Sequence, residues 1–464
     1  KDDGVTYESS TSNTYTFTNL TPGTNYQIKV YVKDNNNFES TIYNVLGATS
    51  YTNPSINSAV FSNVLTDRFT ITATAVGGTN LVKTYYYSKD NGATYQSSTS
   101  NTYTYTGLTQ NTTYNVKVYV EDTLNYTSNI ISTSTKTLDA NRLLYNAVLV
   151  DNGGSTAITT KGSPDFAITA TTNEGMYAMA DDYGTSYYFR GAVDNNWVKF
   201  AGIYWRIVRV NGDNSVKLIY SGTTAPTEAQ KAVMTGTGTQ ITTWKFNSNE
   251  NSAEYVGYMY TLGSQRGLGT ASTMKTYLEN WYESNLASYD NKIADTIFCN
   301  DRSTYSGTVA GANYTGNGVG TATTWFGTAR RLINASSLAP IGTGPSLICP
   351  HKDDAFTKAD TTKGNGKSLQ KVGLLTADEA SIAGLATGTS ISSNYLYTNN
   401  YYWLGSPYLH NSNNCVFEFT VYSLGTLLYG SVYGTLGVRA VVSLSSDIYS
   451  SSGNGTWNNP YVIN

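Results

Sequence analysis

The sequence predicts a multidomain chain in which all-β sandwich modules precede a larger α+β domain. Residues 1–34 and 89–122 are near copies at an offset of 88 positions, with 23 identities in 34. A repeat of that period is typical of tandem β-sandwich modules. Beyond about Leu138 the repeat ends, and hairpin and helix signals replace it.

The repeated segment carries strand and turn signals. Apolar and polar residues alternate along Tyr26–Val32, which is the period of a half-buried strand. Asn91-Gly92 follows Thr84–Tyr87 and predicts a hairpin turn. Residues 56–88 have no counterpart ahead of Lys1. We therefore expect residues 1–50 to be the C-terminal part of a module truncated at its N-terminus, and 51–138 to be a complete module.

One corner of the repeat resembles a known module family. Asn19–Tyr26 (NLTPGTNY) resembles the corner of fibronectin type III modules, where a Tyr hydroxyl bonds to the backbone upstream. Leu108 and Tyr114 repeat its Leu and Tyr, whereas Pro22 becomes Gln110. The resemblance implies immunoglobulin/fibronectin-like sandwiches that act as spacers.

Residues 139–464 combine strands with two predicted helices. Tyr204–Val210 and Val216–Tyr220 predict a hairpin that turns at Asn211-Gly212. Ser272 is a helix cap, and Thr376 with Glu379 forms a capping box that opens a second, short helix. The first helix has an apolar stripe that predicts core packing: Met274, Tyr277, Leu278, Trp281 and Tyr282.

An ordered series of blocks in this part resembles a domain family of unknown function found in surface and secreted proteins of gut bacteria. The match covers roughly residues 180–464. The family is similar to C-type-lectin-like domains, a group that includes formylglycine-generating enzymes and the variable proteins of diversity-generating retroelements. The resemblance implies an α+β domain whose ends meet and whose irregular loops and late hairpin build one face. The blocks are SYYFRGAV, NNWVKFAGIYWRIVRVNGDNSVKLIY, YVGYMY, STMKTYLENWYESNL, FCNDRS, KVGLLTADEASIAG, YYWLGSP and GVRAVVSL.

The chain has three cysteines, Cys299, Cys349 and Cys415. The first two either form a disulfide or lie buried as thiols, and an extracellular composition favours the disulfide. The family's FCND and Cys-Pro cysteines correspond to Cys299 and Cys349, which implies that these two pair. Cys415 is then left over.

Composition favours an extracellular protein on a cell or virion surface. Charged residues are 13% of the chain, the net charge is −3, and there are 40 Tyr. About 25% charged residues is usual in soluble proteins. The small net charge excludes a nucleic-acid partner as the leading hypothesis. No run of about 18 apolar residues exists, so no membrane insertion is expected in this fragment.

The sequence offers little material for catalysis. With only His351 and His410, nucleophilic chemistry that depends on a histidine is poorly supported. The Cys349–Asp354 segment has no zinc-site spacing, and the Glu-Pro-Asn and Gln-Pro-Asp calcium triplets of sugar-binding C-type lectins are missing. Arg206 and Arg439 are expected to be structural and to bond loop carbonyls or a carboxylate. We expect no enzyme activity, no metal and no cofactor.

The strongest functional signal is the Tyr-, Ser-, Asn- and Gly-rich run at 401–444, which has the composition of an antibody paratope. Val416–Tyr422 predicts a strand, Ser423–Thr426 a turn, and Leu427–Tyr429 the start of a return strand. The predicted ligand-binding residues are Tyr408, His410, Asn411, Asn413, Asn414, Tyr422, Leu424, Leu427, Tyr429 and Tyr433.

Residues 408–433 also fit the residue set that adenine-directed mutagenesis by a retroelement produces. The segment has no Lys, Gln, Met or Trp, and only Glu418 breaks the pattern. Ordinary hairpin composition in a Lys-poor chain explains the same observation, and this explanation is the favoured one.

Three functional hypotheses follow. The leading one is an extracellular adhesin or receptor-binding protein that presents a ligand-binding head on stalk modules to a host or cell-surface protein or glycan. The alternative is a self-associating structural subunit of a surface appendage or phage fibre. The third, an enzyme related to the formylglycine generators, is weakened because Cys415 has no neighbouring cysteine.

Overall fold

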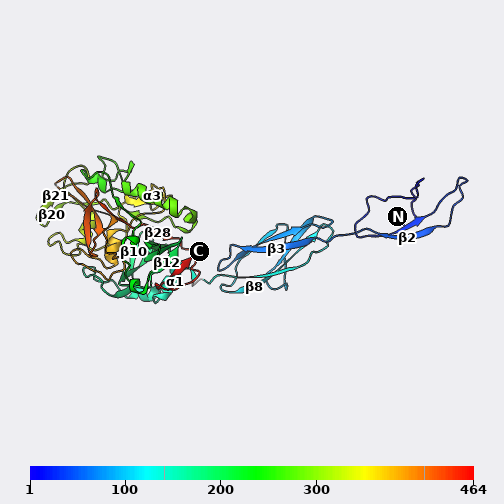
Figure 1. Cartoon of the computed structure of the whole chain (residues 1–464), viewed down its shortest axis with the longest axis horizontal. Coiled ribbons are helices and arrows are strands. Elements are labelled where there is room, and N and C mark those ends of the chain that lie inside the picture. The colour runs from blue at the N-terminus through cyan, green and yellow to red at the C-terminus, as the bar shows by residue number, and fades with distance from the viewer. Residues whose placement is uncertain (140–141, 412) are drawn as a thin grey trace. The chain divides into compact units, whose positions relative to one another are not determined.

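A computed structural model describes residues 1–139, 142–411 and 413–464 of the chain. The chain divides into two compact units, Lys1–Ala140 and Asn141–Asn464. Figure 1 shows the β-rich N-terminal unit in blue and cyan and the larger C-terminal unit in green to red. Each unit is described by itself below. Within the described residues, no helix combines the length and the apolar character that crossing a bilayer requires.

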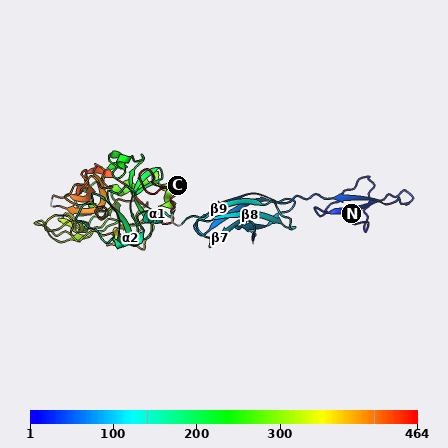
Figure 2. The same ribbon diagram turned by 90° about the horizontal axis from the view of Figure 1, so that it is seen from below.

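The second module of the N-terminal unit is a β-sandwich of the fibronectin type III-like kind. Its two sheets have the strand orders β3-β4-β7 and β6-β5-β8-β9. Figure 2 shows β7, β8 and β9 of this sandwich. The strands are β3 Ser55–Ser62, β4 Phe69–Val76, β5 Val82–Ser88, β6 Gln96–Ser98, β7 Thr102–Tyr105, β8 Thr113–Asp122 and β9 Ile131–Lys136.

The predicted turn and corner are present in this module, and β8 shows the alternation that was predicted for the equivalent segment Tyr26–Val32. Val116 and Val118 on β8 are fully buried, and Lys117 between them is partly exposed. In Tyr26–Val32 itself, Val30 and Val32 are 47% and 68% exposed. Asn91 and Gly92 both take positive φ angles, 60° and 90°, in the loop that joins the antiparallel strands β5 and β6, so the chain turns where predicted, although the loop is longer than a two-residue hairpin turn. The Tyr114 hydroxyl accepts a hydrogen bond from the backbone N–H of Thr109 at 2.9 Å.

Residues 1–50 repeat only part of this arrangement. They contain one antiparallel pair, β1 Asn25–Val30 and β2 Tyr43–Ala48, in which Val30 lies opposite Tyr43. The corner is present here too, because the Tyr26 hydroxyl accepts from the N–H of Thr21 at 2.8 Å. This pair corresponds to β8 and β9 of the second module.

The C-terminal unit contains two seven-stranded sheets. In the first, β29 pairs in parallel with β12, and the N–H of Leu144 donates to the carbonyl of Ile448, so the beginning and end of the unit lie side by side. The predicted 204–220 hairpin is confirmed, although Asn214 rather than Gly212 takes the positive φ angle. The strands of this sheet are β10 Asn173–Asp181, β11 Gly184–Gly191, β12 Trp197–Phe200, β13 Ile203–Val210, β14 Val216–Gly222, β28 Val441–Leu444 and β29 Tyr461–Ile463.

The second sheet holds the predicted late hairpin, which is confirmed as β25 and β26. Short pairs β16–β17, β18–β23 and β20–β21 lie outside both large sheets. The strands of the second sheet are β15 Thr242–Lys245, β19 Thr304–Tyr305, β22 Thr324–Phe326, β24 Tyr402–His410, β25 Val416–Val421, β26 Leu427–Ser431 and β27 Thr435–Val438. The short pairs are Met259–Tyr260 with Thr270–Ala271, Phe298–Cys299 with Ala355–Phe356, and Gly307–Val309 with Ala312–Tyr314.

Both predicted helices are confirmed. The Ser272 side chain caps the first by accepting from the N–H of Lys275, and Thr376 and Glu379 form the capping box of the second. Three further helices among the described residues have no side-chain cap and so were not predicted from the sequence. The helices are α1 Leu144–Asp151, α2 Ser155–Thr160, α3 Thr273–Asn285, α4 Gly327–Leu332 and α5 Ala377–Ile382.

We predict that Tyr114→Phe lowers the free energy of unfolding of the second module by about 1 kcal/mol, the usual net contribution of one hydrogen bond. The substitution removes the acceptor that holds the N–H of Thr109. Chemical denaturation of the chain measures the loss. Tyr103→Phe on β7, in the opposite sheet, leaves this bond intact and serves as the control. Equal losses in the two variants would contradict the role of the corner.

Candidate ligand-binding site

A buried group of charges connects helix α5 to the first sheet. Glu379 of α5 accepts from Arg209 of β13 at 3.0 Å and from Lys217 of β14 at 2.7 Å. Burial raises the pKa of Glu379, but Lys217 and Arg209 outweigh burial and lower the pKa to about 2. Arg209 also donates to Asp181 at 2.7 Å. The charges are paired, so their burial is compatible with a stable fold.

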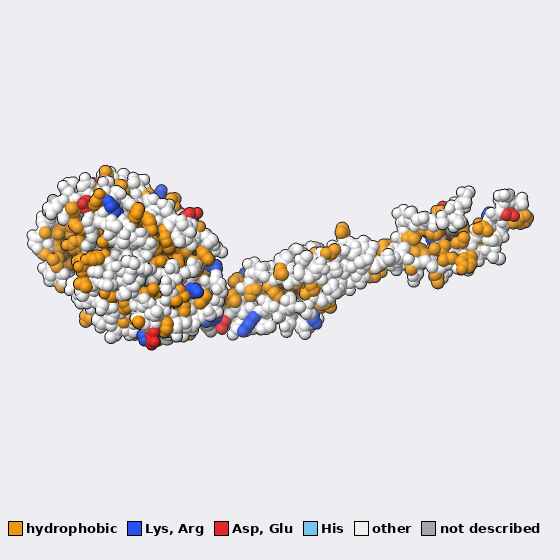
Figure 3. Space-filling view, viewed as in Figure 1, with side chains coloured by type: hydrophobic (Ala, Val, Ile, Leu, Met, Phe, Trp, Pro, Cys, Tyr) orange, Lys and Arg blue, Asp and Glu red, His pale blue; other side chains and the backbone are white. Residues whose placement is uncertain are grey.

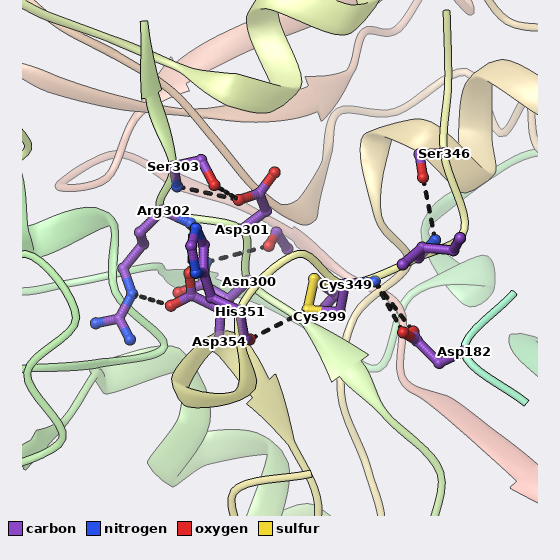
Figure 4. The surroundings of a disulfide bond; sticks show 12 residues. Asp182, Cys299, Asn300, Asp301, Arg302, Ser303, Ser346, Cys349, His351 and Asp354 are labelled. Atoms are coloured by element: carbon purple, nitrogen blue, oxygen red, sulfur yellow. Dashed lines mark hydrogen bonds and ion pairs between the residues drawn. A yellow bond between two sulfur atoms is a disulfide. The ribbon is translucent and has the colours of Figure 1, made fainter. Parts of the chain in front are cut away.

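A second group of buried charges surrounds the disulfide (Figure 4). Cys299 and Cys349 are bonded, as expected, and the N–H of Cys349 donates to the carboxylate of Asp182 at 3.0 Å. Close by, Arg302 pairs with the fully buried Asp354 at 2.6 Å. Arg302 also donates to the carbonyl of Met259 at 2.7 Å. These contacts join β18 and several long loops, so the disulfide lies in a fixed framework.

The two arginines that were expected to bond loop carbonyls do so. Arg206 donates to the carbonyls of Val193 and Ala232, and Arg439 donates to those of Tyr220 and Leu396. Both guanidinium groups are buried. They hold loop backbone inside the C-terminal unit and do not contribute to an exposed site.

The hairpin turn is fixed at Gly425. This residue has a φ angle of 79°, and a Cβ there would lie 1.8 Å from the carbonyl oxygen of Ile391. The N–H of Gly425 donates to the carbonyl of Tyr422, and the N–H of Ile391 donates to that of Leu424. The turn is thus held against the 391 segment, while the Leu424 side chain stays 52% exposed.

Three rings form what we call the aromatic face: Tyr408, Phe417 and Tyr429. The ring of Tyr429 stacks on Tyr408 at 4.4 Å between centroids and meets the edge of Phe417 at 5.2 Å. Beneath them, the buried Phe419 lies directly opposite Tyr429 on β25 and packs edge-on against Tyr408 at 5.0 Å. Tyr429 is 43% exposed, so a supported aromatic ring faces solvent.

The other predicted ligand-binding residues that reach the surface lie at opposite ends of β25. Tyr422 and Leu424 lie at the turn end, where Tyr422 packs edge-on against Tyr401 at 4.3 Å. Asn413 and Asn414 lie in the loop that precedes β25 and are exposed. A strand of six residues spans about 17 Å. One small ligand therefore does not reach both ends.

Asn411 and Tyr433 have local partners at the loop end. The Asn411 side chain accepts from the N–H groups of Asn413 and Cys415, so it shapes the loop. Tyr433 is 49% exposed, and the ammonium of Lys245 lies 3.5 Å from its ring centroid.

Two predicted ligand-binding residues are corrected by the structure. His410 is fully buried: its Nδ1 lies 3.2 Å from the carbonyl of Ala322, and burial lowers the pKa of the ring. Leu427 is 1% exposed, and its N–H donates to the carbonyl of Ala386. Leu427 lies on the same side of the hairpin as Tyr429 but next to the turn, where the strand pairs with the 386–387 segment. His410 lies on the other side, opposite the buried Val416 of β25. These contacts come from distant parts of the chain, which the sequence alone did not reveal.

Sequence reasoning missed other exposed residues beside the hairpin. Tyr401 is 38% and Trp244 is 41% exposed, whereas Leu428, at 37%, lies in the predicted return strand and was expected to be an exposed anchor. Trp244 and Lys245 belong to β15, which pairs with β27, so only the fold brings them next to Tyr433. No local pattern connects residues almost two hundred positions apart, whereas Tyr401 lay within the Tyr-rich run.

Glu418 points to the opposite side of β25 from Phe417. It is fully buried, and neither carboxyl oxygen has a hydrogen-bond partner in the described part of the chain. Burial raises the pKa of Glu418 well above its usual range, and Arg302 offsets this only in part. The environment therefore favours the neutral carboxylic acid.

Comparison with known proteins identifies no family. No family model matches the chain, and no curated protein sequence matches it. Solved structures give partial likenesses. A chitinase from Bacillus thuringiensis is 22% identical over 19% of this chain and only 14% of its own, with a TM-score of 0.18.

Small sandwich domains give similar scores. The PKD1 domain of a Vibrio cholerae metalloprotease is 18% identical over 19% of this chain and 99% of its own, with a TM-score of 0.16. A human fibronectin type III domain is 15% identical over 19% of this chain and 75% of its own, with a TM-score of 0.16. Scores this low carry no functional assignment.

We predict that removing the disulfide by Cys299→Ser with Cys349→Ser lowers the free energy of unfolding of the C-terminal unit by about 4 kcal/mol. This is the loop-entropy value for cysteines 50 positions apart. Urea denaturation of the variant against the parent measures it. Cys415→Ser, which leaves the disulfide in place, is the control. A double variant as stable as the control would show that the crosslink contributes nothing.

We predict that Glu418→Gln stabilises the protein at pH 8 by at least about 1 kcal/mol and has a smaller effect at pH 4. Because the folded state raises the pKa of Glu418, the folded state binds this proton more tightly than the unfolded chain. The contribution of Glu418 to the free energy of unfolding is therefore fully present below the pKa that this residue has in the unfolded chain. It is lost as the pH rises through the higher pKa that the residue has in the folded protein. Each pKa unit corresponds to about 1.4 kcal/mol.

Melting temperatures at both pH values measure the difference. Glu228→Gln, which removes an exposed carboxylate, is the control. A Glu418→Gln effect that is the same at pH 4 and pH 8 would contradict a pKa raised by burial.

Proposed function

We propose that the protein is an extracellular adhesin or receptor-binding protein. In this proposal the fibronectin-like modules are stalk elements and the C-terminal unit is a C-type-lectin-like head. The head binds a protein or glycan on a host or other cell surface through its late hairpin. The role is contact rather than catalysis.

The observation that carries the proposal is the exposed ring of Tyr429, held by Tyr408 and Phe417. A ring that is already fixed loses little conformational entropy on binding, so its contact area converts efficiently into affinity. Tyr is also among the residues enriched at the energetic centres of interfaces. Leu424, exposed at the turn, supplies an apolar contact at one end of the same hairpin.

Two further features support an extracellular setting. Disulfides persist in oxidising compartments, and Cys299 and Cys349 form one here. The low content of charged residues, 13%, together with 40 Tyr, suits a surface that makes hydrogen bonds and stacking contacts.

A finer part of the proposal is diversification of the hairpin by a retroelement. Asn413, Asn414, Leu424 and Tyr429 are exposed and can vary without loss of core packing. His410, in the same segment, is buried. Sequencing the gene from many isolates tests this part: variation should concentrate at the exposed positions and spare His410. If the hairpin sequence is the same in all isolates, and no template repeat or reverse transcriptase gene lies near the gene, diversification by a retroelement is ruled out.

A structural subunit of an appendage or phage fibre is the second candidate. The observation that favours it is the exposure of apolar residues on the second module, such as Val60 of β3 at 58% and Val76 of β4 at 54%. Exposed apolar patches of this kind mark association surfaces. Negative-stain imaging separates the two candidates, because a structural subunit forms ordered filaments or defined trimers and an adhesin does not.

We predict that Tyr429→Ala weakens binding to the cognate surface molecule by at least about thirtyfold, the size expected for a central interface residue. Glycan and host-protein arrays identify the molecule, and surface plasmon resonance measures the affinity. Leu369→Ala replaces a 70% exposed residue of the same unit outside the hairpin and should change affinity less than about twofold. A folded protein that binds nothing on either array would contradict the proposal.

A further inference from the structure

Strand β26 lies at an edge of the second sheet. Among the strands of the described residues it pairs with β25 alone. Its residues, Leu427–Ser431, include no charged residue and no Pro. Proteins usually protect an open edge with Lys, Pro, a bulge or a covering segment, because the edge presents unpaired backbone groups to other chains. Lys245 on β15, another edge strand of this sheet, is a residue of this protective kind.

The backbone of Tyr429 points away from β25. In an antiparallel pair, alternate residues exchange hydrogen bonds with the partner strand, and the residues between them direct their N–H and C=O groups to the other edge. The N–H of Tyr422 donates to the carbonyl of Thr426, and the N–H of Val432 donates to that of Val416. Residues with even numbers therefore bond across this pair. Tyr429 lies between them, and within the described ranges its N–H and C=O have no backbone partner.

The chain itself already uses one part of this edge. The N–H of Leu427 donates to the carbonyl of Ala386, and Thr387 forms a parallel bridge with Leu427. The chain then reaches the hairpin turn, where the N–H of Ile391 donates to the carbonyl of Leu424. The edge is therefore covered from the turn to Leu427 and open at Tyr429. An extended backbone is the kind of partner that it takes.

We propose that an extended peptide segment of a partner protein adds to β26 at Tyr429 as a further strand. This inference rests on the proposed binding role and narrows the ligand to a polypeptide. In strand addition, main-chain hydrogen bonds supply affinity and alternate side chains supply specificity. The peptide residue opposite Tyr429 lies beside its exposed ring, where an aromatic or β-branched side chain makes the best cross-strand pair.

A second copy of the chain fits this edge poorly. A two-fold pair of β26 strands centred on Tyr429 places residue 431 of one copy opposite residue 427 of the other. The 386–387 segment already occupies that position. The carbonyl of Ser431 is also taken, because it accepts from the N–H of Gly434. The open stretch therefore runs only from Tyr429 to the N–H of Ser431, which suits a short peptide segment.

The surroundings favour a peptide with few charges. Glu250 accepts from the Ser431 hydroxyl, and the ammonium of Lys245 lies over the ring of Tyr433, so both charged groups at this end of the hairpin are engaged. Figure 3 shows few charged side chains on the visible face of the C-terminal unit. We therefore expect an uncharged segment with an aromatic or β-branched residue opposite Tyr429.

The test uses a phage-displayed library of random nine-residue peptides, selected on the whole chain. Fluorescence anisotropy then measures the affinity of each selected peptide and of variants that carry one backbone N-methyl group. Methylation of the residue that donates to the Tyr429 carbonyl should raise the dissociation constant at least about tenfold, because it removes that bond and blocks the approach. Methylation of either neighbour, whose N–H points away from β26, should change the constant less than about twofold.

Two substitutions at one position separate the backbone from the ring. Tyr429→Ala removes the ring and keeps the N–H, whereas Tyr429→Pro removes both. The N–H that Pro lacks makes no bond to β25, and Pro is tolerated on edge strands where the N–H faces solvent. Tyr429→Pro should weaken peptide binding at least about tenfold more than Tyr429→Ala does. Thermal unfolding checks that both variants fold, and the N-methyl scan gives the answer on the unchanged protein if the Pro variant does not.

Three results overturn the proposal and leave the proposed binding role intact. They are glycan binding without selection of any peptide, peptide binding that no N-methyl group weakens, and equal peptide affinities of the folded Pro and Ala variants. A dimer in analytical ultracentrifugation that Tyr429→Pro abolishes assigns the edge to a second copy and also overturns it. A folded chain that binds no peptide and no molecule on the arrays contradicts both the strand addition and the binding role.

Discussion

The C-terminal unit depends on one buried carboxylate, that of Glu379. It closes the capping box of α5 and at the same time pairs with Arg209 and Lys217 on adjacent strands of the first sheet. Removing one partner of a buried ion pair strongly destabilises a protein, because the remaining charge is left without compensation. The helix start and the two strands are therefore fixed relative to one another, and Asp181 extends the same group through Arg209 to the end of β10.

This framework explains how a hairpin rich in Tyr, Ser and Gly keeps one conformation. Trp403 of β24 is buried and donates to the carbonyl of Trp244, and Gly425 is pressed against the Ile391 backbone. The aromatic face therefore projects from strands that are held on their other side. Arg302 and Asp354, beside the disulfide, stabilise the loops around these strands in the same way. Rigid support of this kind is what an exposed binding residue needs.

Features with local causes were predictable from the sequence, and features with distant causes were not. Ser272, Thr376 and Asn91-Gly92 each act within a few residues, so the two helices and the hairpin turn were predicted. Helix α1 has no side-chain cap and was not predicted. In the candidate site, the exposed Leu424 and Tyr429 were predicted, whereas Trp244 required the pairing of β15 with β27. Burial of His410 depended on a strand phase that composition does not reveal.

In the proposed binding role, the length of β25 has a consequence for how ligand preference can change over time. Its two ends are about 17 Å apart, and substitutions farther apart than about 10 Å usually act additively. Replacing Leu424 at one tip should therefore leave the contribution of Asn414 at the other tip unaltered. Substitutions at one end of β25 can therefore change ligand preference without a matching substitution at the other end. The number of different binding surfaces is then the number of variants at one end multiplied by the number at the other.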